Sequence, residues 1–188
     1  MIGRRLFLLV FAGALASGFG CSGGSDNSGG GTTTPALLCT DGGAAAANGV
    51  TLKCGGAVDS TTVQVGVVMG GPSGGPTTLR GLNFDVTYDP ANLEFVPAAN
   101  YTSPLFPNAL ILVTLENGVP GRLVVSIQQP GSSPNVVVST GQFSVLTLTF
   151  ARASGMSFAS SPLAFENSEA TNASAAVAFA SSLALSYP

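Results

Sequence analysis

Side chains that commonly carry out chemistry are scarce in this sequence, and histidine is absent from its 188 residues. Without histidine, the usual general base is missing and a Ser–His arrangement is impossible. Paired carboxylates could still hydrolyse a glycosidic bond. The candidates are Asp85, Asp89, Glu94, Glu116, Glu166 and Glu169. None of them stands in a pattern that marks a catalytic acid, and carboxylates scattered over a solvated surface are more common than catalytic ones. We therefore expect no catalytic residue and no enzymatic activity.

Oxygen-rich and glycine-rich segments are the remaining candidates for ligand binding. Glu166 and Glu169, with Asn167 and Asn172 nearby, could coordinate Ca²⁺ through oxygen atoms, but a polar loop is the simpler interpretation. The glycine-rich segment 70–75 is followed by a strand pattern, whereas a phosphate-binding loop opens a helix. The sequence therefore predicts no metal and no cofactor.

The start of the chain has the three parts of an export signal. Two arginines at positions 4 and 5 supply positive charge, Leu6–Ala16 is an apolar run too short to span a bilayer, and small residues lead to Cys21. The segment ending in Cys21 resembles the lipobox of bacterial lipoproteins, with Gly18 in the place where Leu is usual. The resemblance implies that Cys21 is acylated after cleavage just before it. An ordinary secretory signal is the alternative.

A polar spacer follows this cysteine. Ser22–Thr34 consists mainly of Gly, Ser and Thr and has no apolar residue, so it is expected to behave as a flexible coil. Such a spacer allows an anchored domain to stand off from a membrane. We expect a signal peptide at 1–20, a lipid-anchored tether at 21–36 and a folded domain at 37–188, exported to the outer membrane or cell surface.

Two cysteines remain after the lipidation candidate. In an exported protein, Cys39 and Cys54 most simply form a disulfide, whose loop of 15 residues contributes about 3 kcal/mol in the chain-entropy model. A metal site is the alternative, but it is disfavoured because the sequence has neither histidine nor a CxxC spacing.

Composition limits the classes of partner. Charged residues make up only 8% of the chain and hydrophobic residues 45%, so the polar surface must be built from Ser, Thr, Asn and Gln. Loss of residues 1–20 removes two of six basic residues, which leaves four against nine acidic residues and a net charge of −5. With no basic stripe to neutralise phosphates, we expect no nucleic-acid partner.

Apolar residues alternate with polar ones over several short segments. The pattern predicts half-exposed antiparallel strands, separated by turns rich in Gly, Pro and Asn. Ala44–Ala47 is predicted to be a loop, and Ala175–Tyr187 to supply a closing strand. We therefore predict an all-β sandwich, with strands within 63–67, 82–88, 123–127 and 146–150 and turns at 70–76, 89–92, 117–121 and 129–134.

Three segments carry a combination of motifs that can be compared with known families. Gly81–Val96 (GLNFDVTYDPANLEFV) has a strand ending in Tyr-Asp-Pro and then a Leu that re-enters the core; Gly121–Ile127 and Gly141–Phe150 have a Gly followed by an alternating strand. In this order and spacing, from roughly Val63 to Ala180, the sequence resembles the cohesin family. This resemblance implies an antiparallel jelly-roll β-sandwich of about nine strands, as in cohesins and some carbohydrate-binding modules, and a non-catalytic module that binds dockerins.

The resemblance also implies where a partner would bind. In dockerin-binding members, the strand before Tyr-Asp-Pro presents an Asn and an Asp outward; Gly81 and Asn83 stand at these two positions. The family's acidic contact on the following strand falls near Gln128 and Gln129, so this sequence departs from the dockerin-specific contacts. The candidate partner-binding residues are Asn83, Asp85, Thr87 and Gln128.

Two other functions remain open at this point. Sugar-binding platforms use exposed aromatic rings, and here Tyr101, with Phe106 as a possible companion, is the candidate for carbohydrate binding. A passive envelope component without a tight ligand is the third alternative. The expected partner is thus a dockerin-like protein module or a polysaccharide, with membrane attachment only through the lipid anchor.

Overall fold

The computed structural model describes residues 35–153, 155 and 157–188. The predicted signal peptide, Cys21 and nearly all of the predicted tether lie outside the described residues. The described residues form strands and loops, and no helix among them is of the length and hydropathy that a membrane crossing requires.

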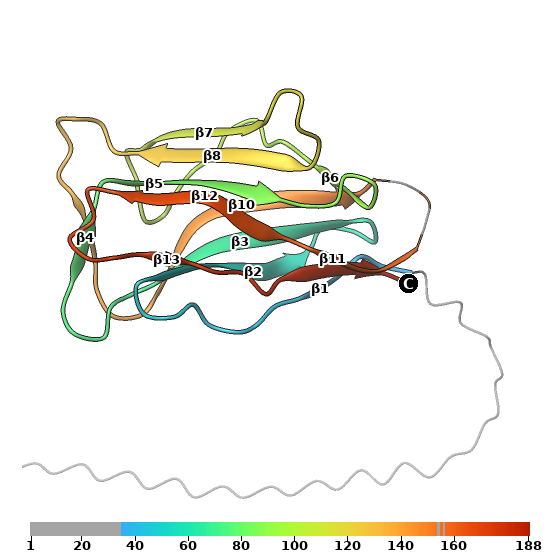
Figure 1. The fold of residues 1–188 in the computed structure, drawn as a ribbon, viewed down its shortest axis with the longest axis horizontal. Coiled ribbons are helices and arrows are strands. Elements are labelled where there is room, and N and C mark those ends of the chain that lie inside the picture. The colour runs from blue at the N-terminus through green and yellow to red at the C-terminus, as the bar shows by residue number, and fades with distance from the viewer. Residues whose placement is uncertain (1–34, 154, 156) are drawn as a thin grey trace, which may run out of the picture. The chain divides into compact units, whose positions relative to one another are not determined.

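Fourteen strands follow one another along the described chain (Figure 1). They are β1 (Leu38–Thr40), β2 (Gly49–Ala57), β3 (Thr62–Gly70), β4 (Thr77–Leu79), β5 (Gly81–Thr87), β6 (Leu93–Phe95), β7 (Leu110–Leu115), β8 (Arg122–Gln128), β9 (Val136–Val138), β10 (Gln142–Arg152), β11 (Phe158–Pro162), β12 (Ala164–Thr171), β13 (Ala178–Phe179) and β14 (Ala184–Tyr187). The all-β prediction is confirmed.

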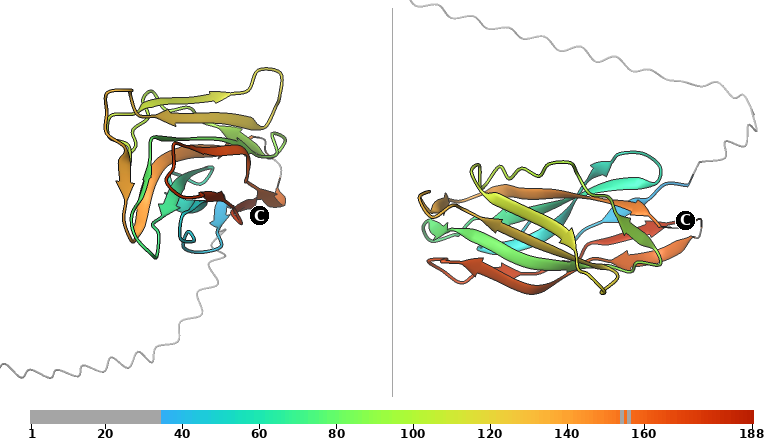
Figure 2. Two further views of the ribbon diagram at one scale, coloured as in Figure 1. Left: turned by 60° about the vertical axis from the view of Figure 1, so that its left-hand side comes forward. Right: turned by 90° about the horizontal axis from the view of Figure 1, so that it is seen from above.

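Two principal sheets form the sandwich. The five-stranded sheet has the order β13-β2-β3-β10-β6, and the four-stranded sheet has the order β12-β5-β8-β7. All pairings in them are antiparallel except that of β13 with β2, which is parallel. Figure 2 shows the two layers from two further sides. These sheets contain nine strands, but the predicted total was too low, because short peripheral strands form the additional groups β1-β14-β11 and β4-β9.

The core lies between the two principal sheets and follows the predicted alternation. On β5 the side chains of Leu82, Phe84 and Val86 are buried, and β3, β8 and β10 contribute their alternate residues to the same cluster. Tyr88 continues the inward side of β5, and its ring meets that of Phe150 edge to face at 5.3 Å. The predicted turns and the loop at 44–47 are also present, so the sequence pattern correctly located most of the sandwich.

Two segments differ from the sequence-based expectation. The predicted closing strand is two short strands in different sheets, because β13 pairs with β2 and β14 pairs with β1 and β11. The segment interpreted as a polar loop around Glu166 is strand β12, an edge of the four-stranded sheet. Most side chains of β12 are exposed and polar, so its sequence shows no alternation of apolar and polar residues that would mark a strand.

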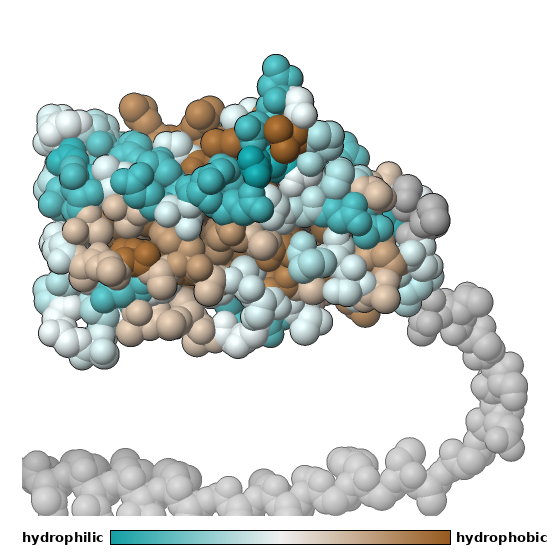
Figure 3. Space-filling view, viewed as in Figure 1, coloured by the Kyte–Doolittle hydropathy of each residue, from teal (hydrophilic) through white to brown (hydrophobic). Residues whose placement is uncertain are grey.

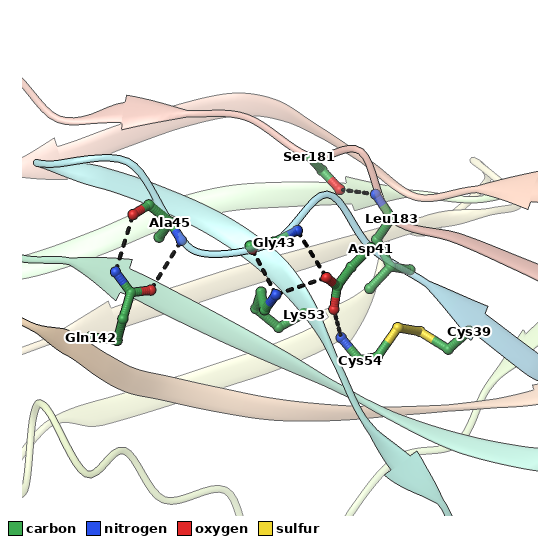
Figure 4. A network of polar contacts seen from close by, with 9 residues as sticks. All are labelled: Cys39, Asp41, Gly43, Ala45, Lys53, Cys54, Gln142, Ser181 and Leu183. Carbon is green, nitrogen blue, oxygen red and sulfur yellow. Dashed lines mark hydrogen bonds and ion pairs between the residues drawn. A yellow bond between two sulfur atoms is a disulfide. The ribbon is translucent and has the colours of Figure 1, made fainter.

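The N-terminal part of the domain is fastened to β2 by a covalent and an ionic contact (Figure 4). Cys39 on β1 and Cys54 on β2 form the predicted disulfide. Asp41 Oδ1 accepts a hydrogen bond from Lys53 Nζ at 2.7 Å, and its Oδ2 accepts one from the backbone N–H of Cys54 at 2.8 Å. The Lys53 ammonium group, followed by the backbone N–H groups of Cys54 and Gly43, lowers the pKa of Asp41 to about 2.

Candidate partner-binding face

The outer side of the four-stranded sheet brings the predicted partner-binding residues together. The register of β5 with β8 places Asn83 beside Ser126 and Asp85 beside Val124. Side chains alternate between the core and the surface along each strand, so these four residues lie on the outer side of the sheet. We call this surface the β5–β8 face. Its members are Gly81, Asn83, Asp85 and Thr87 on β5, Arg122, Val124, Ser126 and Gln128 on β8, Leu110, Leu112 and Thr114 on β7, and Glu166, Glu169 and Thr171 on β12.

An uncharged hydrogen-bond network occupies one end of the β5–β8 face. Asn83 Oδ1 accepts hydrogen bonds from Ser126 Oγ at 2.7 Å and from Gln128 Nε2 at 3.1 Å. Gln128 Nε2 also donates to Thr171 Oγ1 at 3.0 Å, which joins β8 to β12 across β5. The network holds the amide side chains of Asn83 and Gln128 in fixed orientations, and such preorganised groups suit recognition of a matching surface.

Gly81 leaves no room for the outward Asn that the cohesin resemblance implies at this position. A Cβ atom built on Gly81 would lie 2.2 Å from the backbone oxygen of Ile127 and 2.6 Å from Oε1 of Gln128. The Gln128 side chain thus lies against Gly81, in the space that an outward side chain would need. The position at which the cohesin resemblance implies an outward Asn is therefore closed to a side chain in this domain.

The other end of the β5–β8 face is an ionic cluster around Arg122. Its guanidinium group pairs with Glu116 at 3.1 Å and with Glu166, and its Nε lies 4.0 Å from Asp85 Oδ2. The hydrogen bond to Glu116, followed by that to Glu166, raises the pKa of Arg122. Asn167 Nδ2 donates to Asp85 Oδ2 at 2.6 Å, and Asp85 is only 7% exposed. Three carboxylates surround one guanidinium, so this end has an excess of negative charge.

Exposed leucines form the margin of the β5–β8 face along β7. Leu110 is 72% exposed and Leu112 is 56% exposed. In Figure 3, hydrophobic surface is visible along the edge where β7 lies, next to a hydrophilic band over the neighbouring strands. Apolar side chains beside an ordered polar network are the usual composition of a protein–protein interface.

The predicted partner-binding residues are thus together, but they differ in accessibility. Asn83, Thr87 and Gln128 are partly exposed, whereas Asp85 is covered by Arg122 and Asn167 and offers a partner little surface. Gln129, the other position near the family's acidic contact, is buried and off the face. Sequence reasoning missed the β7 leucines, because Leu110–Leu115 is almost uniformly apolar and shows no alternation.

The carbohydrate-binding candidate lies on the opposite principal sheet. Tyr101 is partly buried in a hollow of about 260 Å³ beside Thr147 and Thr149, and its hydroxyl accepts a hydrogen bond from the backbone N–H of Ala98 at 2.9 Å. Phe106, its suggested companion, is wholly buried, so that part of the prediction was wrong. This arrangement lacks the broad exposed ring of a sugar platform. Carbohydrate binding at Tyr101 stays a prediction.

A mostly apolar cleft of about 440 Å³ opens at one end of the four-stranded sheet, next to the turn between β7 and β8. Glu94 and Glu116 are the carboxylates in its lining. Glu116 is bound to Arg122, so the cleft does not present two unengaged carboxylates for acid–base chemistry. Within the described residues, no group of three or more His, Cys, Asp or Glu side chains could hold a metal ion. Of the earlier calcium candidates, Glu166 pairs with Arg122 and Asn167 donates its side-chain N–H to Asp85.

Comparison with known proteins identifies the fold. No family model and no curated protein matches the sequence. Among solved structures, the third ScaC cohesin of Acetivibrio cellulolyticus, in complex with the ScaB dockerin, has a TM-score of 0.51 at 12% identity, over 71% of this chain and 94% of that one. The sixth cohesin of scaffoldin B from Acetivibrio cellulolyticus, in complex with a Cel5 dockerin, has a TM-score of 0.50 at 17% identity and the same coverage. The domain therefore has a cohesin-like fold.

Proposed function

From this cohesin-like fold we propose that residues 37–188 are a non-catalytic module that recognises a protein partner through the β5–β8 face. The observation that carries the proposal is the position of Asn83, Thr87 and Gln128, which lie together on one sheet face beside exposed Leu110 and Leu112. Fold similarity alone would not assign a function. The composition of this particular face supports the assignment.

The chemistry of the β5–β8 face indicates the kind of partner surface that fits it. Leu110 and Leu112 require an apolar counterpart, and the amides of Asn83 and Gln128 require hydrogen-bonding groups rather than charges. The excess of carboxylates around Arg122 favours a nearby Lys or Arg of the partner. A dockerin-like module with an apolar stripe and basic residues at one end would meet these requirements.

Binding by the mature chain and two single-lysine variants tests this proposal. Val124→Lys places a charge in the middle of the β5–β8 face, and Thr147→Lys places the same charge on the exposed side of β10, beside the Tyr101 hollow. Purified dockerin modules and the secreted proteins of the source organism serve as ligands. We expect Val124→Lys to weaken binding of a protein by at least about tenfold, because the lysine lies opposite Asp85, offsets the carboxylate excess that favours a basic partner residue, and places a long charged side chain where the partner would pack.

The control separates the two faces of the domain. Thr147→Lys should bind the protein partner like the wild type. If Val124→Lys binds the protein partner normally, or if Thr147→Lys is the only variant that fails to bind it, recognition does not use the β5–β8 face. Retention on polysaccharide that Thr147→Lys abolishes would instead support the carbohydrate alternative at Tyr101.

We further propose that the module is displayed at the outer membrane or cell surface through a lipid on Cys21. The support is the sequence around Cys21, with its apolar run before and its polar spacer after. Mass spectrometry of the N-terminal peptide should find an acylated cysteine at this position. A mature protein that starts elsewhere, or that carries an unmodified Cys21, would contradict the anchor and leave partner recognition unaffected.

A further inference from the structure

The sheet edges of this domain are protected in all places but one, as far as the described residues extend. An exposed edge strand offers unpaired N–H and C=O groups to other chains, and proteins usually shorten, bulge or charge such strands. The edge strands β1, β4, β6, β9 and β13 have two or three residues. The longer edge strands β11 and β12 both have an irregular register; β11 ends in a proline and β12 carries two glutamates.

Strand β7 has none of these protective features. It is a regular strand of six residues, Leu110–Leu115, without charge, proline or bulge, and it pairs only with β8. In Figure 1 it lies at the outer edge of its sheet. Such an edge is suited to pairing with another strand.

The direction of the backbone groups can be derived from the register with β8. Glu116 N–H donates to the carbonyl of Arg122, which makes this a hydrogen-bonded pair, and such pairs alternate along an antiparallel ladder. The N–H and C=O groups of Ile111, Val113 and Leu115 therefore point away from β8. None of these groups makes a backbone hydrogen bond to another described segment outside the strand ladders.

We propose that two copies of this chain associate through antiparallel pairing of β7 with β7, which joins their four-stranded sheets into one continuous sheet. With the twofold axis at Val113, Val113 faces its equivalent and Ile111 faces Leu115 of the second copy. All outward-pointing backbone groups of the strand then find partners, because a twofold antiparallel pairing is self-complementary. This association does not depend on the proposed partner recognition.

The side chains of β7 also favour a second copy as the occupant of the edge. In this register, Leu112 faces Thr114 and Leu110 faces Glu116, so no like charges oppose one another. Leu110, Leu112 and Leu115 are 72%, 56% and 52% exposed, and pairing would cover part of this apolar surface. A single strand pair is a small interface, so we expect a dissociation constant in the micromolar to millimolar range.

Sedimentation equilibrium of the mature chain over a wide concentration range tests the association. We expect a reversible monomer–dimer equilibrium. Val113→Pro removes an N–H that points away from β8, and proline is tolerated on an edge strand when its N–H position faces solvent. This variant should remain folded by circular dichroism and lose dimerisation. Leu112→Lys, a second variant near the twofold axis, should raise the dissociation constant by about tenfold or more.

Val124→Lys is the matched control, because it places a lysine on the same face but on β8, one strand away from the edge. It should dimerise like the wild type, although the proposed function predicts that it loses the partner. Amide exchange of Ile111, Val113 and Leu115 should slow as protein concentration rises.

A chain that stays monomeric at the highest concentration, or a dimer that persists in both β7 variants, would overturn the proposal. Protection of the three amides that appears only on adding a partner protein would also overturn it, since the edge would then bind the partner.

Discussion

Asp41 is the residue whose ionisation most directly supports the N-terminal part of the domain. Its pKa is lowered from 3.8 to about 2, mainly by the hydrogen bond from Lys53. A depressed carboxyl pKa stabilises the folded state above the unfolded-state pKa, and this contribution disappears as the pH falls through the folded-state value. We expect Asp41→Asn to lower the free energy of unfolding at pH 7 by about 1–2 kcal/mol after allowance for solvent screening.

Urea unfolding of both proteins at pH 7 and at pH 2 measures this effect. The difference between wild type and Asp41→Asn should be large at pH 7 and small at pH 2. Glu94→Gln, at an exposed carboxylate that forms no ion pair in the described structure, is the control and should change little at either pH. If wild type and Asp41→Asn differ in their free energy of unfolding by the same amount at both pH values, the ionisation of Asp41 does not stabilise the N-terminal part of the domain.

Gly81 determines whether the β5–β8 face can carry an additional side chain at the start of β5. Gly81→Asn should destabilise the domain by about 1–3 kcal/mol, because the nearest atom to the new Cβ is a backbone oxygen of Ile127, which moves only with its strand. Truncating the nearby side chain with Gln128→Ala should not rescue the variant. Thermal unfolding of both variants measures the effect, and a Gly81→Asn protein as stable as the wild type would show that the sheet adjusts freely here.

At the scale of elements, the disulfide joins the short strand β1 to the long strand β2. Cys39 and Cys54 are separated by 15 residues, so closure of this loop should contribute about 3 kcal/mol to stability. The double variant Cys39→Ser/Cys54→Ser should show this loss in urea unfolding. Reducing agent should lower the stability of the wild type by a similar amount and leave the double variant unchanged. Wild-type stability of the double variant would mean that β1 is held by its other contacts.

The sequence could predict strands that have one buried and one exposed side. Leu82, Phe84 and Val86 alternate with surface residues, and the predicted strand agrees with β5. Such alternation is lost where a strand lies at an edge. Leu110–Leu115 is apolar on both sides, whereas Ala164–Thr171 is mostly polar, so neither β7 nor β12 was found.

The candidate site was predictable only in part for the same reason. The alternation of side chains along one strand placed Asn83, Asp85 and Thr87 on a common side. This alternation contains no information about which strands lie next to each other. The burial of Asp85 depends on two such neighbours, Arg122 from β8 and Asn167 from β12. The position of Leu110 and Leu112 beside the network likewise follows from sheet order.

At the scale of the whole molecule, all basic side chains in the described part of the chain are engaged. Lys53 pairs with Asp41, Arg80 donates to the carbonyls of Pro130 and Ser133, Arg122 pairs with glutamates, and Arg152 lies 4.0 Å from the Tyr187 ring centroid. Trypsin cleaves after Lys and Arg in extended, accessible segments. We therefore expect the folded domain to resist trypsin, with cleavage only as fast as global unfolding allows.

Proteolysis at increasing urea concentrations measures this property. The onset of cleavage should coincide with the loss of the circular dichroism signal. Chymotrypsin provides a comparison, because its exposed leucine sites lie within β1 and β7, so its cleavage should follow the same transition. Rapid tryptic cutting after Arg80 or Arg152 under native conditions would reveal local opening that the packed structure does not account for.

The disulfide also determines how the domain would respond to mechanical load. Leu38 faces Ser186 in the β1–β14 pair, so tension applied to the chain ahead of Pro35 would peel β1 away one residue at a time. Peeling stops at Cys39, where the covalent link passes the force directly to the middle of β2. That strand is paired with β3 along most of its length, so the hydrogen bonds of this ladder resist its displacement. Reduction would let the segment that leads from Cys39 to the start of β2 at Gly49 extend, so the resistance of the domain to extension depends on the redox state of this link.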